Sequence, residues 1–67
     1  MCYVTAIING SRIVNGKRFS SSKKASKYIS SILNTYGCQI TEEYESANGH
    51  ELVADYNNRI FVQSANN

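Results

Sequence analysis

Three Asn-Gly pairs punctuate this sequence and constrain its fold more than any other feature. They are Asn9-Gly10, Asn15-Gly16 and Asn48-Gly49. Both residue types tolerate the positive φ angles of tight turns, so an Asn-Gly pair between apolar residues is the strongest short-range signal of a β-hairpin. The pairs therefore predict that most of this chain of 67 residues forms β-sheet.

The N-terminal segment reads as strands. Residues 3–8 are rich in β-branched and aromatic side chains, which favour strands, and alternate residues of a strand point to opposite faces. One face would carry Cys2, Val4, Ala6 and Ile8, and the other Tyr3, Thr5 and Ile7. Segments 12–14 and 17–19 flank the second Asn-Gly pair and form either one bent strand or two.

The middle of the chain carries the pattern of an amphipathic helix. Apolar side chains recur with helical spacing over about three turns. They are Ala25, Tyr28, Ile29, Ile32, Leu33 and Tyr36. The serine run 20–22 offers N-cap hydroxyls before this stripe, and Gly37 follows it where a left-handed C-cap residue is favoured.

The C-terminal third is predicted to be a three-stranded antiparallel meander. Segment 38–44 alternates like a strand with one solvated face. Segments 51–56 and 59–63 flank Asn57-Asn58, a pair that can form a two-residue turn. We therefore expect a single α+β domain over residues 1–63, with an N-terminal hairpin, one helix on one face of the sheet, the meander, and a frayed tail at 64–67.

Charge is segregated along the chain. Six basic residues lie in the first half and all five acidic residues in the second, where Arg59 is the one cation. The net charge of +2 therefore hides a strongly dipolar molecule. Each charged group gives a candidate site, and each could instead be a solvated surface that keeps a small domain soluble.

The basic group is a candidate site for nucleic acid or a phosphate-bearing ligand. A helix start with free N–H groups, serine hydroxyls and lysines suits an anion, and clustered cations suit a nucleic-acid backbone. The candidate residues are Arg12, Lys17, Arg18, Ser20, Ser21, Ser22, Lys23, Lys24 and Lys27. Aromatic residues nearby could stack on bases, although Phe19 and Tyr28 also fall where the core needs apolar bulk.

The acidic group is a candidate protein-binding site. Carboxylates on adjacent strands could face a basic partner, and tyrosines are enriched in binding hot spots. The candidate residues are Glu42, Glu43, Tyr44, Glu45, Glu51, Asp55 and Tyr56. Their alternative role is the solvated side of a half-buried sheet.

The sequence carries no pattern that predicts catalysis, metal binding or a cofactor. His50 is the one histidine, nothing pairs it with Cys2 or Cys38, and these residues are too few for a zinc site. Two cysteines in a short chain indicate free thiols, and no apolar stretch is long enough to span a membrane. We expect a cytoplasmic protein that is not an enzyme and has no membrane partner.

Three functional hypotheses follow. The first is a small regulator or inhibitor that binds a larger protein, which could be one that handles nucleic acid, as accessory proteins of phages or mobile elements do. The second is binding of nucleic acid or a phosphate ligand through the basic group. The third is a structural role as a symmetric homodimer, paired through a sheet edge or an open sheet face.

Overall fold

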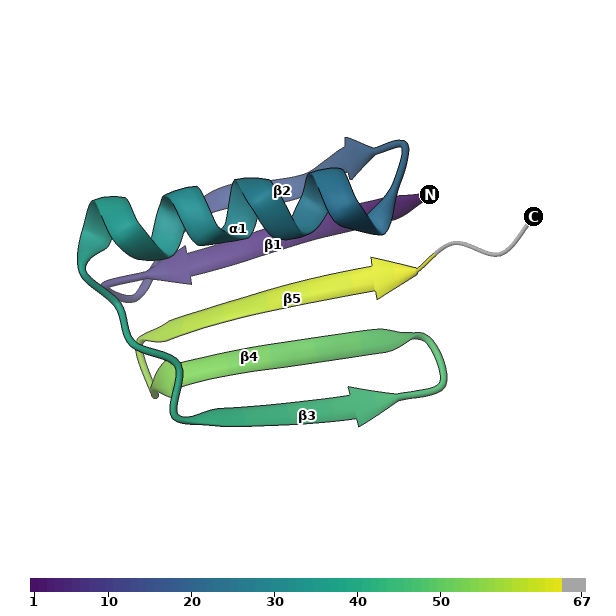
Figure 1. The fold of residues 1–67 in the computed structure, drawn as a ribbon. Helices are drawn as coiled ribbons and strands as arrows, with labels where there is room; N and C mark the ends of the chain where they lie inside the picture. The colour runs from purple at the N-terminus through teal and green to yellow at the C-terminus, as the bar shows by residue number, and fades with distance from the viewer. Residues whose placement is uncertain (65–67) are drawn as a thin grey trace.

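The computed structural model describes residues 1–64 and confirms a single small α+β domain (Figure 1). Strands β1 (Cys2–Ile8) and β2 (Ser11–Phe19) precede helix α1 (Ser22–Tyr36), and strands β3 (Glu42–Ser46), β4 (Gly49–Asp55) and β5 (Asn58–Ser64) follow it. All neighbouring strands pair antiparallel in the order β2-β1-β5-β4-β3. The first and last strands therefore lie side by side at the centre, and β2 and β3 form the two edges.

The Asn-Gly pairs act in three different ways. Asn9-Gly10 forms the predicted hairpin turn, with φ angles of 52° and 78°. Asn15-Gly16 instead lies inside β2, where Gly16 has a φ of 64° and the pairing with β1 shifts register between Val4 and Ala6. Segments 12–14 and 17–19 are therefore one irregular strand. At the third pair, the turn comes before Gly49, which begins β4.

Both predicted caps of α1 are confirmed. Ser21 is the N-cap, and its hydroxyl accepts a hydrogen bond from the Lys24 N–H at 3.3 Å. Gly37 takes a left-handed φ of 67°, and the next N–H, of Cys38, donates to the Leu33 carbonyl at 2.9 Å. This bonding closes the helix where the sequence pattern predicts its end.

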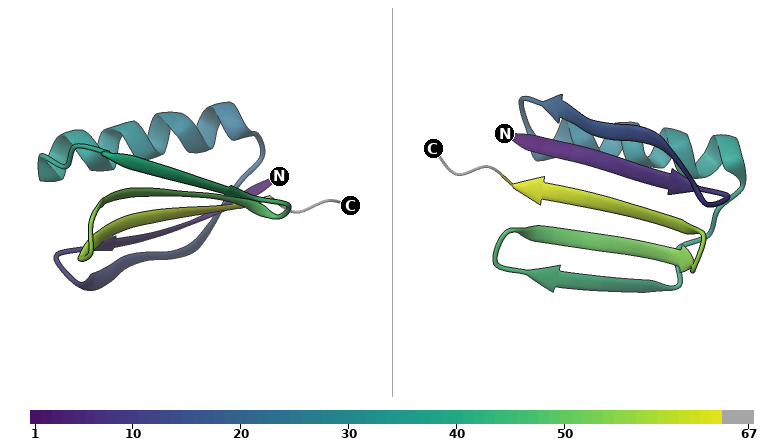
Figure 2. Two further views of the ribbon diagram at one scale, coloured as in Figure 1. Left: turned by 90° about the horizontal axis from the view of Figure 1, so that it is seen from below. Right: turned by 180° about the vertical axis from the view of Figure 1, so that it is seen from behind.

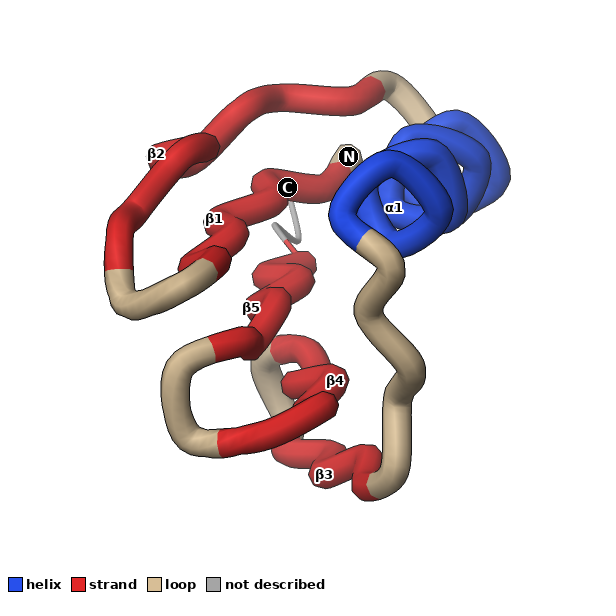
Figure 3. Tube along the Cα trace, turned by 90° about the vertical axis from the view of Figure 1, so that its left-hand side faces the viewer, coloured by secondary structure: helices blue, strands red, loops and turns tan. Residues whose placement is uncertain are grey.

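The core lies between the helix and one half of the sheet. The predicted row on β1 is buried, and it packs against the helix stripe and the inner row of β5. The buried residues are Cys2, Val4, Ala6, Ile8, Ala25, Ile29, Ile32, Ile60 and Val62. The helix lies over β1 and β2, so β4 and β3 extend beyond it (Figures 2 and 3).

The predicted strand at 38–44 is wrong in its bounds. Residues 38–41 connect the helix to the far edge of the sheet, and β3 runs from Glu42 to Ser46. The cause is the C-cap, because the Cys38 N–H is held by the helix and the chain must then cross from the covered half to the opposite edge.

The β4–β5 turn lies one residue earlier than predicted. Tyr56 and Asn57 form it, and Asn58 begins β5. Asp55 causes this, because its carboxylate accepts from the Asn57 N–H at 2.8 Å and from the Asn58 side chain. Ser64, predicted in the tail, is the last residue of β5. The rest of the predicted tail, 65–67, lies outside the described residues.

Candidate protein-binding surfaces

The face of the sheet opposite the helix, called the open face below, carries side chains in three rows set by the strand register. In each row, directly paired residues from neighbouring strands lie side by side. The first row, from β2 to β3, is Arg12, Ile7, Arg59, Val53 and Glu42. The second runs Thr5, Phe61, Glu51 and Tyr44, and the third runs Arg18, Tyr3, Gln63, Gly49 and Ser46.

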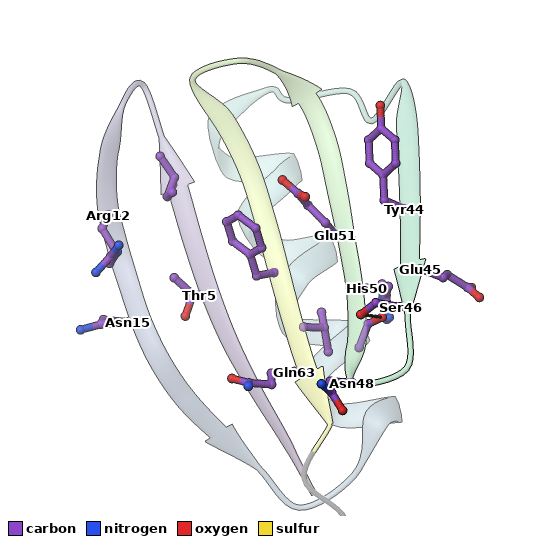
Figure 4. A pocket seen from close by; sticks show the side chains of 14 residues that line it. Thr5, Arg12, Asn15, Tyr44, Glu45, Ser46, Asn48, His50, Glu51 and Gln63 are labelled. Carbon is purple, nitrogen blue, oxygen red and sulfur yellow. Dashed lines mark hydrogen bonds between the residues drawn. The ribbon is translucent and has the colours of Figure 1, made fainter.

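A shallow groove of about 530 Å³ lies against this face (Figure 4). Its lining reaches from Arg12 and Asn15 on β2 to Tyr44 on β3. Ile7 and Phe61 line it between these edges, and both are half-buried. The face thus carries apolar side chains near its middle, beside the charged residues of β4 and β5, and further charged residues at its edges.

An ion pair lies within the open face. Arg59 and Glu51 approach to 3.4 Å, with 36% and 24% of their side chains exposed. The Arg59 guanidinium also lies 5.4 Å from the Phe61 ring and 5.8 Å from the Tyr56 ring. Among the described residues its buried Nε has no hydrogen-bond partner. These contacts hold the Arg59 side chain against the sheet.

The arginines and the lysines lie on opposite sides of the sheet. Register places all three arginines of the chain, Arg12, Arg18 and Arg59, on the open face. The lysines lie on the helix side, because Lys17 pairs with inward-facing Val4 and the others belong to α1. Arginine and tyrosine are enriched in interface hot spots, and lysine is depleted from interfaces.

The predicted acidic site is divided by the sheet. Glu42, Tyr44 and Glu51 lie on the open face, whereas Glu43 and Glu45 pair with Leu52 and His50 and lie on the other face. Asp55 and Tyr56 belong to the β4–β5 turn. What the fold does bring together is three glutamates along one edge strand, β3, in which all residues are exposed.

Besides Glu51, which pairs with Arg59, two of these acidic groups are engaged locally. The Tyr44 hydroxyl donates to the Glu42 carboxylate, and this hydrogen bond and the charge of Glu42 raise the pKa of Tyr44. The hydrogen bonds from Asn58 and the Asn57 N–H lower the pKa of Asp55. Asp55 therefore serves the turn, while Glu43 and Glu45 remain exposed to a partner.

The predicted basic site is also divided. Arg12 and Arg18 lie on the open face, and the cations of α1 lie on the helix side. Ser20 and Ser22 flank Ser21, whose hydroxyl is used by the helix cap. The first turn of α1 holds no acidic residue that would neutralise Lys23 and Lys24.

The two aromatic residues beside the basic group serve the core. Phe19 and Tyr28 pack with ring centroids 5.0 Å apart and contact the buried cluster. The Lys17 ammonium lies 5.9 Å and 5.7 Å from their ring centroids. Both rings are half-buried, which leaves little surface for stacking on bases.

From the sequence an open sheet face is predicted only as one surface through which a homodimer could pair, and its residues are not identified. Tyr3, Thr5 and Ile7 could be assigned to one side of β1 by alternation, but Phe61 and Arg59 lie more than fifty residues away in sequence. Only the pairing of β1 with β5 places them together. The period-two patterns of 3–7 and 59–63 were the available signals.

Other chemistry is not assembled in the part of the chain that the structure describes. Within residues 1–64, no three His, Cys, Asp or Glu side chains gather as a metal site. Cys2 is buried in the core, and Cys38 is a free, half-buried thiol in the connection after α1. The helix of this region is too short and too polar to cross a membrane.

Comparisons with known proteins found no relative, since no family model, no curated protein and no solved structure matches the chain. Function is therefore inferred from the geometry and charge of the molecule itself.

Proposed function

We propose that the protein is a non-enzymatic binding module that regulates or inhibits a larger protein by docking on it through β3. The observation that supports this is the position, exposure and charge of β3. β3 is an edge strand, its residues are all exposed, and it carries Glu42, Glu43 and Glu45. Within residues 1–64, one side of its backbone is left without a neighbouring strand.

The mode of docking is addition of a partner strand to this edge. An exposed edge offers unpaired N–H and C=O groups to an extended segment, and the alternating side chains of that segment supply specificity. Glu42 lies on one face of the sheet, and Glu43 and Glu45 on the other. A strand added at the edge also places side chains on both faces, so it meets all three carboxylates.

The partner segment is basic. Lysine or arginine at successive positions would meet carboxylates on both faces, and the attraction would also speed the encounter. Tyr44, which is 53% exposed, adds an aromatic surface on the open-face side. Proteins that handle nucleic acid expose such basic segments, which agrees with a role as their regulator or inhibitor.

The test is a titration of ¹⁵N-labelled protein with a short peptide in which Lys-Lys pairs alternate with Thr-Thr pairs, so that Lys falls on both faces of the added strand. We expect chemical-shift changes centred on β3, together with slower amide exchange in β3 as its edge gains hydrogen bonds. The matched control peptide replaces each Lys by Glu and should leave the spectrum unchanged.

Variants of the protein give the second control. Glu43→Lys with Glu45→Lys should abolish the response, whereas Lys23→Glu with Lys24→Glu, which reverses two charges on the helix, should keep it. Shifts spread over α1 or β2, or a response that survives the β3 reversals, would show that β3 is not the docking edge.

Binding of nucleic acid or a phosphate ligand is the second candidate. It is favoured by the first turn of α1, which carries Lys23 and Lys24 and lacks acidic residues. A salt series against DNA and RNA would show affinity that falls steeply as salt rises. Lys23→Gln, Lys24→Gln and Lys27→Gln together should remove this binding, and indifference to them would dismiss it.

A further inference from the structure

We propose that the open face binds the open face of a second copy of this chain, in a two-fold symmetric dimer whose axis runs parallel to the strands. The occupant is thus this protein itself. The interface is the face of the sheet rather than the backbone edge of β3. It shares Glu42 with the proposed function, but neither inference depends on the other.

The middle of the open face has the character of a covered surface. In an antiparallel sheet with one solvated face, the outward residues are mostly polar. Here Ile7, Val53 and Phe61 are only half-buried on the outward side of β1, β4 and β5. A second sheet packed about 10 Å away would remove them from water.

The charge pattern selects one axis for this packing. A two-fold axis parallel to the strands and centred on β5 places β2 of one copy over β3 of the other. The row register then sets Arg12 against Glu42 of the second copy, because both occupy the same row at opposite edges. Symmetry makes this contact twice. An in-plane axis across the strands would instead oppose β2 to β2, and so arginine to arginine.

The same two-fold axis also brings side chains of complementary size together. Ile7 faces Val53 of the second copy, and Phe61 faces its own counterpart on the axis. In the third row Tyr3 lies over Gly49 of the second copy, where the absence of a side chain leaves room for the ring. Aromatic and aliphatic pairs at the centre with charged pairs at the rim are the usual anatomy of an interface.

The centre of the face tolerates its buried charge. Arg59 would lie near the axis, close to its counterpart, but each Arg59 is neutralised within its own chain by Glu51 at 3.4 Å. The aromatic rings on either side hold the guanidinium against the sheet. The dimer would therefore bring together two neutral pairs rather than two isolated cations.

The size of the face favours a dimer of modest affinity. Five strands spaced by about 4.8 Å and roughly seven residues long give a footprint of roughly 450 Å² per copy. Specific interfaces bury about 1,000 Å² or more in total. Two such footprints total roughly 900 Å², just below that range even when the whole face is used, so dissociation within the micromolar range is expected.

Charge reversal across the axis tests the proposal. In a symmetric dimer Arg12→Glu sets a new carboxylate against Glu42, and Glu42→Arg sets a new guanidinium against Arg12. Each variant should raise the dimer Kd by roughly tenfold or more, as measured by sedimentation equilibrium. The double variant should restore the wild-type Kd. Mixing the two single variants should give a heterodimer, since every rim pair is then attractive.

Controls separate this face from the rest of the surface. Glu45→Arg changes the same strand on its other face, and Lys23→Glu changes the helix, so both should leave the Kd within about twofold. Phe61→Lys should fold, because Glu51 lies directly opposite it, but it places two ammonium groups on the axis and should abolish the dimer.

Each possible result either supports or overturns the open-face dimer. A mass that stops at two chains, with the swap pattern and the loss in Phe61→Lys, supports the open-face dimer. A monomer at all concentrations overturns it. A mass that grows without limit and survives Phe61→Lys also overturns it, since that result indicates chains joined edge to edge through β2 and β3. Peptide binding at β3 is measured separately and would stand or fall on its own.

Discussion

Gly49 and Asp55 mark the two ends of β4 and show how single residues set local structure. Gly49 has a φ of 155°, and a Cβ there would lie 2.0 Å from the Val62 carbonyl oxygen. Asp55 closes the strand by accepting from the Asn57 N–H and the Asn58 side chain. One residue thus permits a close approach of two strands, and the other ends the pairing.

Gly49→Ala should destabilise the fold by about 2 kcal/mol or more, since a Cβ meets backbone that cannot move aside. Urea unfolding measures the change. Gly37→Ala is the matched control. Its φ is 67°, no atom of the described residues lies within 4 Å of the added carbon, and the change should cost about 1 kcal/mol. Equal losses in both variants would contradict the proposed contact.

Asp55 predicts a pH dependence of stability. Its folded pKa lies below the usual 3.8, so the unfolded chain binds more protons in the window between the two values. The stabilisation is complete above 3.8 and is lost as the pH falls through the folded pKa. Melting temperatures of wild type and Asp55→Asn should therefore converge in acid. A gap that stays constant with pH would contradict this.

At the scale of elements, α1 is held by its ends and by one buried stripe rather than by favourable charge. Lys23 and Lys24 oppose the positive end of the helix dipole, and the first turn of α1 carries no acidic residue that would offset them. Stability comes instead from the Ser21 cap and from burial of Ala25, Ile29 and Ile32. The helix therefore depends on its contacts with β1 and β2.

Ser21→Ala should cost about 1 kcal/mol, because the Lys24 N–H loses its side-chain acceptor. Chemical unfolding followed by circular dichroism measures it. Ser20→Ala removes a neighbouring hydroxyl that caps nothing and should change stability far less. If the two variants were equally destabilised, Ser21 would not be the working cap.

At the scale of the whole molecule, the buried side chains are unevenly distributed. Every fully buried residue of the described chain belongs to β1, α1 or β5, whereas β3 is exposed throughout. The β3–β4 hairpin extends beyond the helix (Figure 3). The half that holds the fold together is thus separate from the edge proposed to bind a partner.

Hydrogen exchange should follow this division. Amides of β1 and β5 should exchange only through global unfolding, while those of β3 should exchange through local opening at a lower free energy. Native-state exchange in low denaturant gives the comparison, with α1 as an internal reference. Protection in β3 equal to that in β1 would show that the hairpin is part of the same cooperative unit.

Local signals predicted the elements that short-range chemistry controls. The turn at Asn9-Gly10, the Ser21 cap, the stripe from Ala25 to Tyr36 and the C-cap at Gly37 each depend on residues within a few positions of one another. The bounds of β3 and of the β4–β5 turn were missed, because a helix-end hydrogen bond and an Asx contact shift them.

The sequence by itself determined the α+β class, the helix and its caps, and the separation of basic from acidic residues along the chain. Only the tertiary structure decided that β1 pairs with β5, that β2 and β3 are the edges, and that Arg12 and Glu42 share a row. The physical reason is the sequence separation over which each interaction acts. Turn and cap preferences act between near neighbours, whereas strand order and register are set by burying side chains that lie far apart in sequence.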